Sequence, residues 1–427
     1  MRGKIYLLLF ILLFTLSKTG SSQSWKGADL IVDSVYTNMI GSVKLHQVGD
    51  PLAQAIIQVN SQAKLRLTFD YLSQDIPELT YTIVHCNSDW ELSQINSFDY
   101  IDGFGENNFY NYDFSINTIQ PYVRYELEFP NADISPKISG NYLMVVFKEN
   151  NPDSVLFTKR FYVVETRLGI DAYTKQPASG KYYQSHQEIV FEVNYKDFEL
   201  RNPFQELELS LLQNWRLDNA YNDIKPVFVK EERLIYRQES KYVFPGHKEF
   251  RFFDTRNLRL LDSEVKSYNI QKNEIDLFPD QVTVFKEYFY SKDINLKYIN
   301  DIADFSTPEL RADYSKVKFN LATNTPYSQG DIYIFGELSN WQIDKRFKME
   351  YNFETRAYEG EILLKQGFYN YAYNYLKQGE KTGDTSYFDG NHFEAENDYY
   401  IFAYFKGMGD RYQRIVGYTH INSVKRQ

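Results

Sequence analysis

Two neighbouring stretches decide the fold: YTIVHCNSDWELSQINSFDYIDGFGENNFYNYDFS at residues 81–115 and VRYELEFPNADISPKISGNYLMVVF at residues 123–147. Their outer ends alternate apolar and polar residues with the period of two that half-buried β-strands show. The middle is rich in aromatic residues and asparagine and has no helical period. A long loop without periodic structure of its own is more often a binding surface than a connector. We therefore predict that residues 81–147 define the first β-domain and present a docking loop at residues 87–118.

The same alternation recurs along the chain and predicts an all-β protein. Valine, isoleucine, tyrosine and phenylalanine dominate these short segments, as strand propensity favours. Turn signals such as Pro245-Gly246 and Asp389-Gly390 separate them, which indicates antiparallel sandwiches and not βαβ units. We expect no repeat at a fixed period. The predicted strands are LRLTFDY at residues 65–71, VRYELEF at 123–129, IVFEVNY at 189–195, LELSL at 207–211, VKFNL at 317–321 and IYIFG at 332–336.

The first 22 residues have the pattern of a secretory signal peptide. Arg2 and Lys4 precede an apolar run at residues 5–16, and small residues follow up to Ser22. The run is too short to span a bilayer. A buried N-terminal helix is the poorer interpretation, because nothing downstream would cover so uniform an apolar surface. We expect a mature chain that begins at Gln23, is exported and soluble, and does not insert directly into a membrane.

The length of the chain predicts more than one domain. The 427 residues less the 22 of the signal leave about 405, which exceeds what one hydrophobic core usually serves. We expect three consecutive antiparallel β-sandwich domains of Ig-like type. The first occupies residues 23–166, the second residues 167–300, and the C-terminal one residues 311–427. The polar segment at residues 301–310, which contains Pro308, is the predicted linker.

Charge and cysteine content exclude several kinds of partner. Removal of the signal takes away three basic residues and no acidic one, so 47 basic and 57 acidic residues become 44 and 57, a net charge of about −13. This charge opposes binding to nucleic acid and to anionic membrane surfaces. The single cysteine, Cys86, permits no disulfide framework, and we expect no disulfide-linked partner.

Residues for catalysis or metal binding do not form a recognisable motif. His85, Cys86 and Asp89 are close in sequence, but strand alternation sends His85 and Cys86 to opposite faces. An acidic cluster near the C-terminus offers the oxygen ligands that calcium takes, but it lacks EF-hand spacing, and we interpret it as a solvated loop. The sequence has no G-x-S-x-G elbow, and its glycine pairs precede no helical pattern. We expect no catalytic residue, no cofactor and no metal. The acidic cluster consists of Asp384, Asp389, Asn391, Glu394 and Asp398.

Aromatic residues in the loop at residues 87–118 are the candidates for partner binding. A single aromatic residue in a loop usually packs against the core of its domain. This irregular segment has seven, the six candidates given below and Tyr112, which is more than a connecting loop needs. We therefore predict a docking surface whose aromatic anchors contact a partner protein. The candidate residues are Trp90, Phe98, Tyr100, Phe104, Phe109 and Tyr110.

Several motifs in this region also carry a family resemblance. HCNSDW, S-x5-DYIDGF at residues 93–104, DFSINT, YELEFPN and SGNYLMVVF occur in this order. Together they resemble the first domain of the type IX secretion system plug protein, and the resemblance extends less sharply over the rest of the mature chain. It implies a periplasmic, non-enzymatic protein of β-sandwich domains that binds the giant outer-membrane β-barrel translocon and occludes its periplasmic mouth. No individual contact residue is carried over.

The third predicted domain resembles early-sandwich Ig-like domains, a group that includes glycogen- and starch-binding modules. The resemblance rests on Gly336-x4-Trp341 and on YEGEILLKQGFYNYAY at residues 358–373. In such modules a tryptophan after the first strand stacks on sugar, and Trp341 matches that position, but no second tryptophan follows Tyr373. A secreted carbohydrate-binding protein acting through this domain is therefore the alternative function. A glycoside hydrolase is a further one, since spacing alone does not identify a carboxylate pair.

Overall fold

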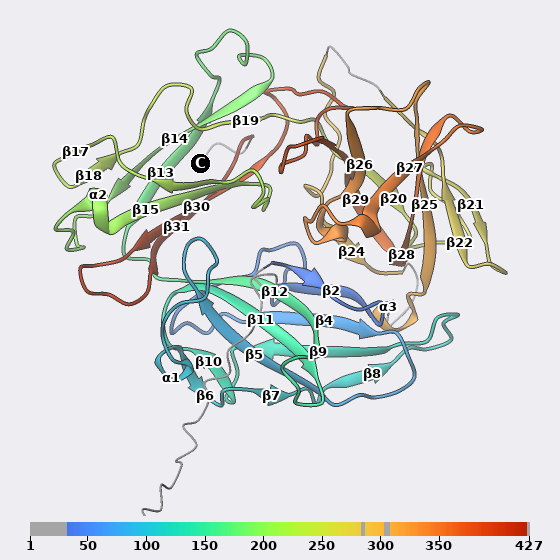
Figure 1. The fold of residues 1–427 in the computed structure, drawn as a ribbon, viewed down its shortest axis with the longest axis horizontal. Helices are drawn as coiled ribbons and strands as arrows, with labels where there is room; N and C mark the ends of the chain where they lie inside the picture. The colour runs from blue at the N-terminus through green and yellow to red at the C-terminus, as the bar shows by residue number, and fades with distance from the viewer. Residues whose placement is uncertain (1–31, 283–286, 303–307, 425–427) are drawn as a thin grey trace, which may run out of the picture.

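The computed structural model describes residues 32–282, 287–302 and 308–424, and strands dominate them (Figure 1). The all-β prediction is confirmed. The α-helices of the described residues are single turns: α1 (Ser97–Tyr100), α2 (Pro203–Glu206) and α3 (Pro308–Arg311). No helix in these ranges is long and apolar enough to cross a membrane. The predicted signal peptide at residues 1–22 and the mature start at Gln23 lie outside the described residues.

The first sandwich is built from residues 34–164. The predicted strands at residues 65–71 and 123–129 coincide with β4 and β9. One sheet has the order β1-β12-β11-β5-β7 with β3 beside β12, and the other has the order β2-β4-β9-β8. The first sheet consists of β1 (Ser34–Val35), β3 (Ile56–Gln58), β5 (Leu79–Cys86), β7 (Asn107–Asn108), β11 (Gly140–Lys148) and β12 (Val155–Val164). The second consists of β2 (Ile40–Gln47), β4 (Leu65–Tyr71), β8 (Tyr112–Phe114) and β9 (Val123–Phe129), and β6 (Ile101–Gly103) pairs with β10 (Ile134–Pro136).

Strand β5 is buried on both of its faces. The alternation predicted from sequence holds, because Tyr81 and Ile83 lie in the core of the first sandwich while Val84 and Cys86 lie in a different apolar cluster. That second cluster includes residues of the other two sandwiches. The expectation of a half-buried strand is therefore wrong, since neighbouring sandwiches cover the face that a single domain would leave to solvent.

The second and third sandwiches depart from the expected division at residues 301–310. The strands between residues 251 and 300 pair with those between 314 and 377, so they belong to the third sandwich. The last two strands return to the second sandwich, where β30 (Asp398–Phe405) lies between β15 (Leu207–Gln213) and β31 (Arg414–Asn422). Sequence order alone cannot reveal such long-range pairing. The third sandwich is thus inserted within the second.

The strands of these two sandwiches are as follows. The second also contains β13 (Gly169–Lys175), β14 (His186–Asn194), β16 (Tyr221–Ile224), β17 (Phe228–Lys230), β18 (Arg233–Ile235) and β19 (Val243–Pro245). The third contains β20 (Arg251–Asp254), β21 (Val265–Asn269), β22 (Glu274–Leu277), β23 (Asp280–Gln281), β24 (Tyr298–Asn300), β25 (Tyr314–Ala322), β26 (Gly330–Phe335), β27 (Lys348–Asn352), β28 (Ala357–Lys365) and β29 (Gly367–Lys377).

Two chain segments connect the inserted sandwich to the second one, and they run side by side. The amide of His392 donates to the carbonyl of His247 at 2.8 Å, and the amide of His247 donates to the side chain of Asn391 at 2.9 Å. We call this pair of segments the neck. The chain therefore enters and leaves the third sandwich at one place.

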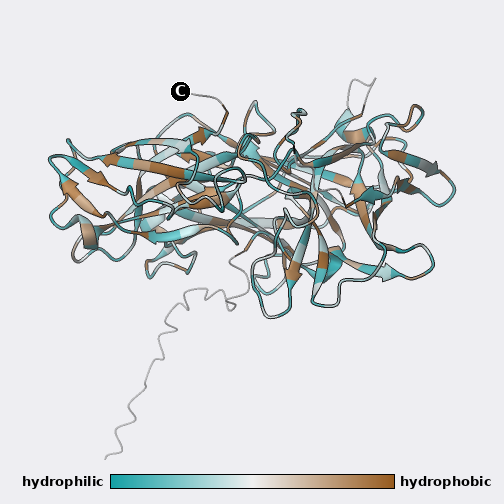
Figure 2. Cartoon of the chain, turned by 90° about the horizontal axis from the view of Figure 1, so that it is seen from above, coloured by the Kyte–Doolittle hydropathy of each residue, from teal (hydrophilic) through white to brown (hydrophobic). Residues whose placement is uncertain are grey.

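The three sandwiches form three lobes around a common centre (Figure 1). Hydrophobic residues follow the strands, whereas the loops at the outer rim are mainly hydrophilic (Figure 2). Because apolar burial is the main favourable term in folding, a core shared by three lobes ties them into one body.

Candidate functional site

Each sandwich contributes one tryptophan to a buried cluster that we call the shared core. Trp90 follows β5, Trp215 follows β15 and Trp341 follows β26, and all three are buried. Their φ angles are 69°, 67° and 58°. Positive φ is uncommon outside glycine. The same unusual loop conformation therefore places one indole from each sandwich in the centre.

Tyr162 of β12 lies in the middle of the shared core. Its ring centroid is 5.3 Å from that of Trp90 and 5.3 Å from that of Trp215, and it stacks on Phe402 at 4.1 Å. The guanidinium of Arg160 lies 4.4 Å above the ring of Trp90. Edge-to-face and stacked arrangements of this kind add to the free energy of area burial. The packing joins the first and second sandwiches through their aromatic side chains.

Trp341 brings the third sandwich into the same region. Its ring packs against Phe335 with a centroid distance of 6.1 Å. It also lines a cavity of about 230 Å³ together with Tyr162 and Trp215. Trp341 is therefore an internal packing residue. Its burial argues against the alternative in which Trp341 stacks on sugar, because a buried indole cannot present its face to a polysaccharide.

The sequence contains a signal for this arrangement that strand alternation and short motifs do not show. Trp215 follows Trp90 by 125 residues, and Trp341 follows Trp215 by 126 residues. Each is preceded by Asp or Asn, at Asp89, Asn214 and Asn340. The expectation of no repeat at a fixed period is therefore wrong.

The repeat is also visible in strand pairing. Strand β5 leads to Trp90 and pairs with β11, which pairs with β12. Strand β15 leads to Trp215 and pairs with β30, which pairs with β31. Strand β26 leads to Trp341 and pairs with β29, which pairs with β20. In each sandwich the strand before the tryptophan thus begins an antiparallel row of three strands, although the third strand of the row, β20, comes earlier in the chain in the third sandwich.

Polar contacts supplement the shared core at each boundary between sandwiches. Between the first and second, the Tyr404 hydroxyl donates to Asn141 at 2.9 Å. Between the second and third, the Arg216 guanidinium donates to the Thr385 hydroxyl at 2.7 Å. Hydrogen bonds that are satisfied in a low-dielectric interior fix relative orientation as well as contributing stability.

The boundary between the first and third sandwiches contains two ion pairs. The Lys365 ammonium lies 2.6 Å from the Asp70 carboxylate, and both side chains are fully buried. Lys44 pairs with Glu337 at 3.1 Å, and the same carboxylate accepts the Tyr298 amide at 3.0 Å. Burial lowers the pKa of Lys365 to about 8, which the charge of Asp70 opposes. These groups specify how the two sandwiches meet.

The six predicted docking residues divide into two groups. Phe98, Phe104 and Tyr110 are 85%, 64% and 75% exposed, and we call these three the aromatic ridge. Trp90, Tyr100 and Phe109 are buried, so they cannot contact a partner without unfolding. The prediction is wrong for these three because burial cannot be read from an aromatic-rich sequence.

The loop that carries the aromatic ridge is more ordered than predicted. It contains α1, β6, β7 and β8, of which β7 pairs with β5 and β8 pairs with β9. Phe109 packs between Phe69 and Tyr81, each at a centroid distance of 5.2 Å. The buried rings thereby hold the loop against the sandwich and leave the ridge outside.

His85, Cys86 and Asp89 form no common site. The imidazole of His85 contacts the Ser93 hydroxyl at 2.6 Å and the Ser139 carbonyl at 3.2 Å, and burial lowers its pKa to about 4. Burial raises the pKa of the Cys86 thiol to about 12, while Asp89 is exposed. Among the described residues, no group of three or more His, Cys, Asp or Glu side chains is placed to hold a metal ion.

Members of the acidic cluster near the C-terminus have protein partners. Asp389 pairs with Arg251 at 2.6 Å and with Lys248 at 3.0 Å. Asp398 accepts from the imidazole of His420 at 2.8 Å. Asp389 thus serves buried ion pairs and Asp398 a side-chain hydrogen bond, whereas Asp384 and Glu394 are exposed, as the expected solvated loop requires.

Comparison with known proteins agrees with these findings. The sequence model described as type 9 secretion system plug protein 1st domain matches residues 40–165, which correspond to the first sandwich. No curated protein matches the chain. The crystal structure of a hypothetical protein from Parabacteroides merdae is 32% identical, with a TM-score of 0.88, and the alignment covers 92% of this chain and 99% of that one. The similarity thus extends over all three sandwiches, and the chain belongs to the type IX secretion system plug protein family.

Proposed function

We propose that this protein is a non-catalytic periplasmic plug that binds the giant outer-membrane β-barrel translocon of the type IX secretion system and occludes its periplasmic mouth. Family membership supports a role in type IX secretion and suggests a periplasmic location. The signal-peptide pattern at residues 1–22 supports export to that compartment. The barrel as partner and occlusion as mechanism are the parts that we propose.

The observation that carries the proposal is the shared core. A body that closes a wide pore has to resist deformation, and independent domains on linkers would move relative to one another. Here Trp90, Trp215 and Trp341 lie in one apolar cluster. Close-packed interiors have low compressibility. A rigid body of three lobes suits occlusion better than it suits a small-molecule reaction.

The aromatic ridge is the proposed contact with the barrel. Aromatic residues are enriched at protein interfaces, where they act as anchors surrounded by polar groups. Phe98, Phe104 and Tyr110 project from the first sandwich and add little to its core. Because a plug has to be released, an interface of modest area fits this role better than an obligate one.

Co-purification of the barrel tests this proposal. Replacement of Phe98, Phe104 and Tyr110 by serine should reduce recovery of the barrel with the tagged plug and increase leakage of a small dye through barrels in vesicles. A matched control replaces the exposed Tyr173, Leu260 and Phe228 by serine and should retain binding. If the unsubstituted protein fails to recover the barrel and its addition leaves leakage unchanged, the proposal is wrong.

A further inference from the structure

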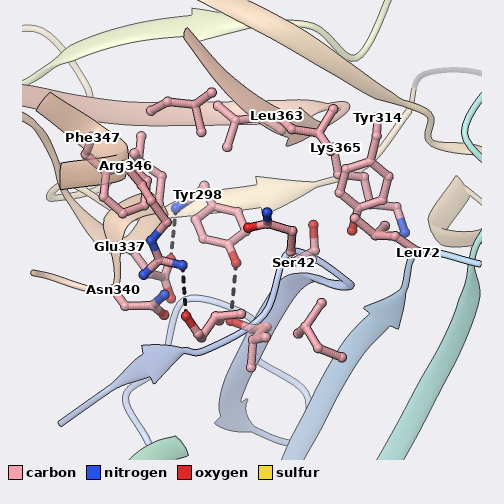
Figure 3. Close-up of a pocket in the computed structure, with 18 of the residues that line it drawn as sticks. Ser42, Leu72, Tyr298, Tyr314, Glu337, Asn340, Arg346, Phe347, Leu363 and Lys365 are labelled. Atoms are coloured by element: carbon pink, nitrogen blue, oxygen red, sulfur yellow. Dashed lines mark hydrogen bonds between the residues drawn. The ribbon is translucent and has the colours of Figure 1, made fainter. Parts of the chain in front are cut away.

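A cleft of about 440 Å³ lies between the first and third sandwiches (Figure 3). Residues 40–43 of β2 line one side, residues 361–365 of β28 line the other, and Tyr298, Tyr314 and Tyr369 contribute phenol rings. Successive side chains of a strand point to opposite faces of its sheet. If a strand presented a face to the cleft, only every second residue would line it. Because consecutive residues of β2 and of β28 line the cleft, each strand presents its edge, with its main-chain groups, to the cleft.

The edge of β28 that borders the cleft has no partner strand beyond Glu359 among the described residues. Strand β27 pairs with β28 only from Glu350↔Glu359 to Asn352↔Ala357. On the opposite side, β28 pairs with β25. The amide of Gln366 donates to the carbonyl of Asp313, and the amide of Thr323 donates to the carbonyl of Arg356. Both hydrogen bonds continue the antiparallel register of β28 and β25.

These two hydrogen bonds fix the direction of every main-chain group in β28. Antiparallel strands exchange hydrogen bonds at alternate residues. The even-numbered residues therefore face β25, and the main-chain groups of Glu361 and Leu363 point to the free edge. Both side chains are exposed, Leu363 to 43%.

Strand β2 presents a second edge across the cleft. It is the first strand in the order β2-β4-β9-β8, where its neighbour is β4. The amide of Leu72 donates to the carbonyl of Met39 at 2.8 Å, so the main chain of Ile40, one residue on, faces away from β4. The pairing register shifts between Gly41 and Lys44, where Ser42 has a φ of 48°. This bulge bends the edge beside the cleft.

We propose that this cleft binds an extended peptide segment of a partner protein, which adds as a strand to the free edge of β28. Main-chain pairing of this kind gives affinity, and pockets for alternate side chains give specificity. The free edge has the sequence Glu-Ile-Leu-Leu at residues 361–364, without lysine or proline, and the ammonium of the next residue, Lys365, is buried against Asp70 and does not cover this edge. The inference is independent of the plug function.

Charge around the free edge specifies the partner further. Glu350 and Glu359 are direct partners in the register of β27 and β28, and Glu361 follows on the same face of β28. The Glu350 side chain is 83% exposed and lies 3.8 Å from the Lys348 ammonium, and the Glu361 carboxylate lies 3.3 Å from the Lys316 ammonium. Three carboxylates beside two lysines leave a net negative charge, and like charges directly opposite each other are destabilising, so a basic side chain above them is favoured. The segment that fits has basic residues on the solvent side alternating with bulky apolar residues on the side of the cleft.

A fluorescein-labelled acetyl-Lys-Phe-Lys-Val-Lys-amide is the probe, and fluorescence anisotropy with the purified full chain is the measurement. Binding should be saturable while light scattering shows a monomer. Methylation of the peptide nitrogens that face β28 should weaken binding about tenfold or more, because each lost main-chain hydrogen bond is worth about 1 kcal/mol. A peptide methylated at the other nitrogens, which face away from β28, should keep its affinity. A peptide with glutamate in place of lysine should lose affinity.

Variants of Leu363 locate the site. Leu363→Pro removes the main-chain donor at the free edge and should abolish binding, whereas Leu363→Ala keeps it and should bind within about threefold of the unsubstituted chain. Hydrogen exchange should slow at the amides of Glu361 and Leu363 when the probe is present. The proposal is overturned if no probe binds, if both methylated peptides bind equally, or if the chain dimerises through this edge in place of binding the probe.

Discussion

The ammonium of Lys365 and the carboxylate of Asp70 meet 2.6 Å apart in the interior, one from the third sandwich and one from the first. Arg124 approaches the same carboxylate at 3.3 Å, and the Tyr314 hydroxyl donates to it at 2.7 Å. Lys365 also donates to the Glu309 carbonyl at 2.8 Å. Each charge is thus compensated, which is the condition under which a buried ion pair is tolerated.

Lys365→Met should lower the free energy of unfolding by about 3–5 kcal/mol, because it leaves the buried carboxylate of Asp70 with less compensation. The double variant with Asp70→Asn should recover part of the loss, since the uncompensated charge is then gone. Urea unfolding followed by fluorescence measures both. Equal stability of the single variant and the unsubstituted chain would contradict the role assigned to this pair.

Acidification should destabilise the protein through His85 and His247. Burial lowers the pKa of His85 to about 4 and that of His247 to about 3, while an unfolded histidine titrates near 6.5. Their stabilising contribution is complete above about pH 6.5 and is lost as the pH falls towards these values, because the unfolded state then binds more protons. On this basis His85 contributes up to about 3 kcal/mol and His247 up to about 5 kcal/mol.

The variant His85→Gln isolates one of these contributions. Unfolding free energies measured from about pH 7 to about pH 4 should fall less steeply in this variant than in the unsubstituted chain. Identical slopes would assign the acid sensitivity to other groups.

Trp341→Ala should reduce stability by about 3–5 kcal/mol, as is usual when a large buried aromatic residue is truncated. The matched control is Phe353→Ala in the same sandwich, whose side chain is 77% exposed and should change stability by less than about 0.5 kcal/mol. Calorimetry distinguishes the two. Normal stability combined with loss of binding to an insoluble polysaccharide would instead restore the carbohydrate-binding alternative.

The Cys86 thiol should report on the integrity of the shared core. It is buried between sandwiches and burial raises its pKa to about 12, so little thiolate exists at neutral pH. A thiol reagent should therefore label the native chain slowly and the urea-unfolded chain rapidly. Substitution of Trp90 or Trp215 by alanine should accelerate native-state labelling, whereas substitution of Phe98 should not.

The local elements of this fold follow from the sequence more closely than their assembly does. Alternation placed β4 and β9 correctly and assigned the two faces of β5, because a period of two is a local property. It did not reveal that both faces are buried. The pairing of β15 with β30 joins residues nearly two hundred positions apart, and local pattern has no access to that.

The candidate site shows the same limit. Phe98 and Phe109 are equally apolar and lie eleven positions apart, yet one is exposed and the other is in the core. What separates them is the docking of the loop onto Phe69 and Tyr81, which is a tertiary event. The tryptophan spacing is present in the sequence, but only a search for single residues at long intervals would find it.

The neck at His247 and His392 gives the chain a definite assembly order. During synthesis from the N-terminus, the first sandwich and then the inserted one have all their strands before the second has received β30 and β31. A half-built sheet that ends at β15 exposes an apolar edge until the last residues arrive. Release of a shortened chain would therefore leave an aggregation-prone intermediate whose missing piece is the final hairpin, and a synthetic peptide covering residues 395–424 should rescue it in trans.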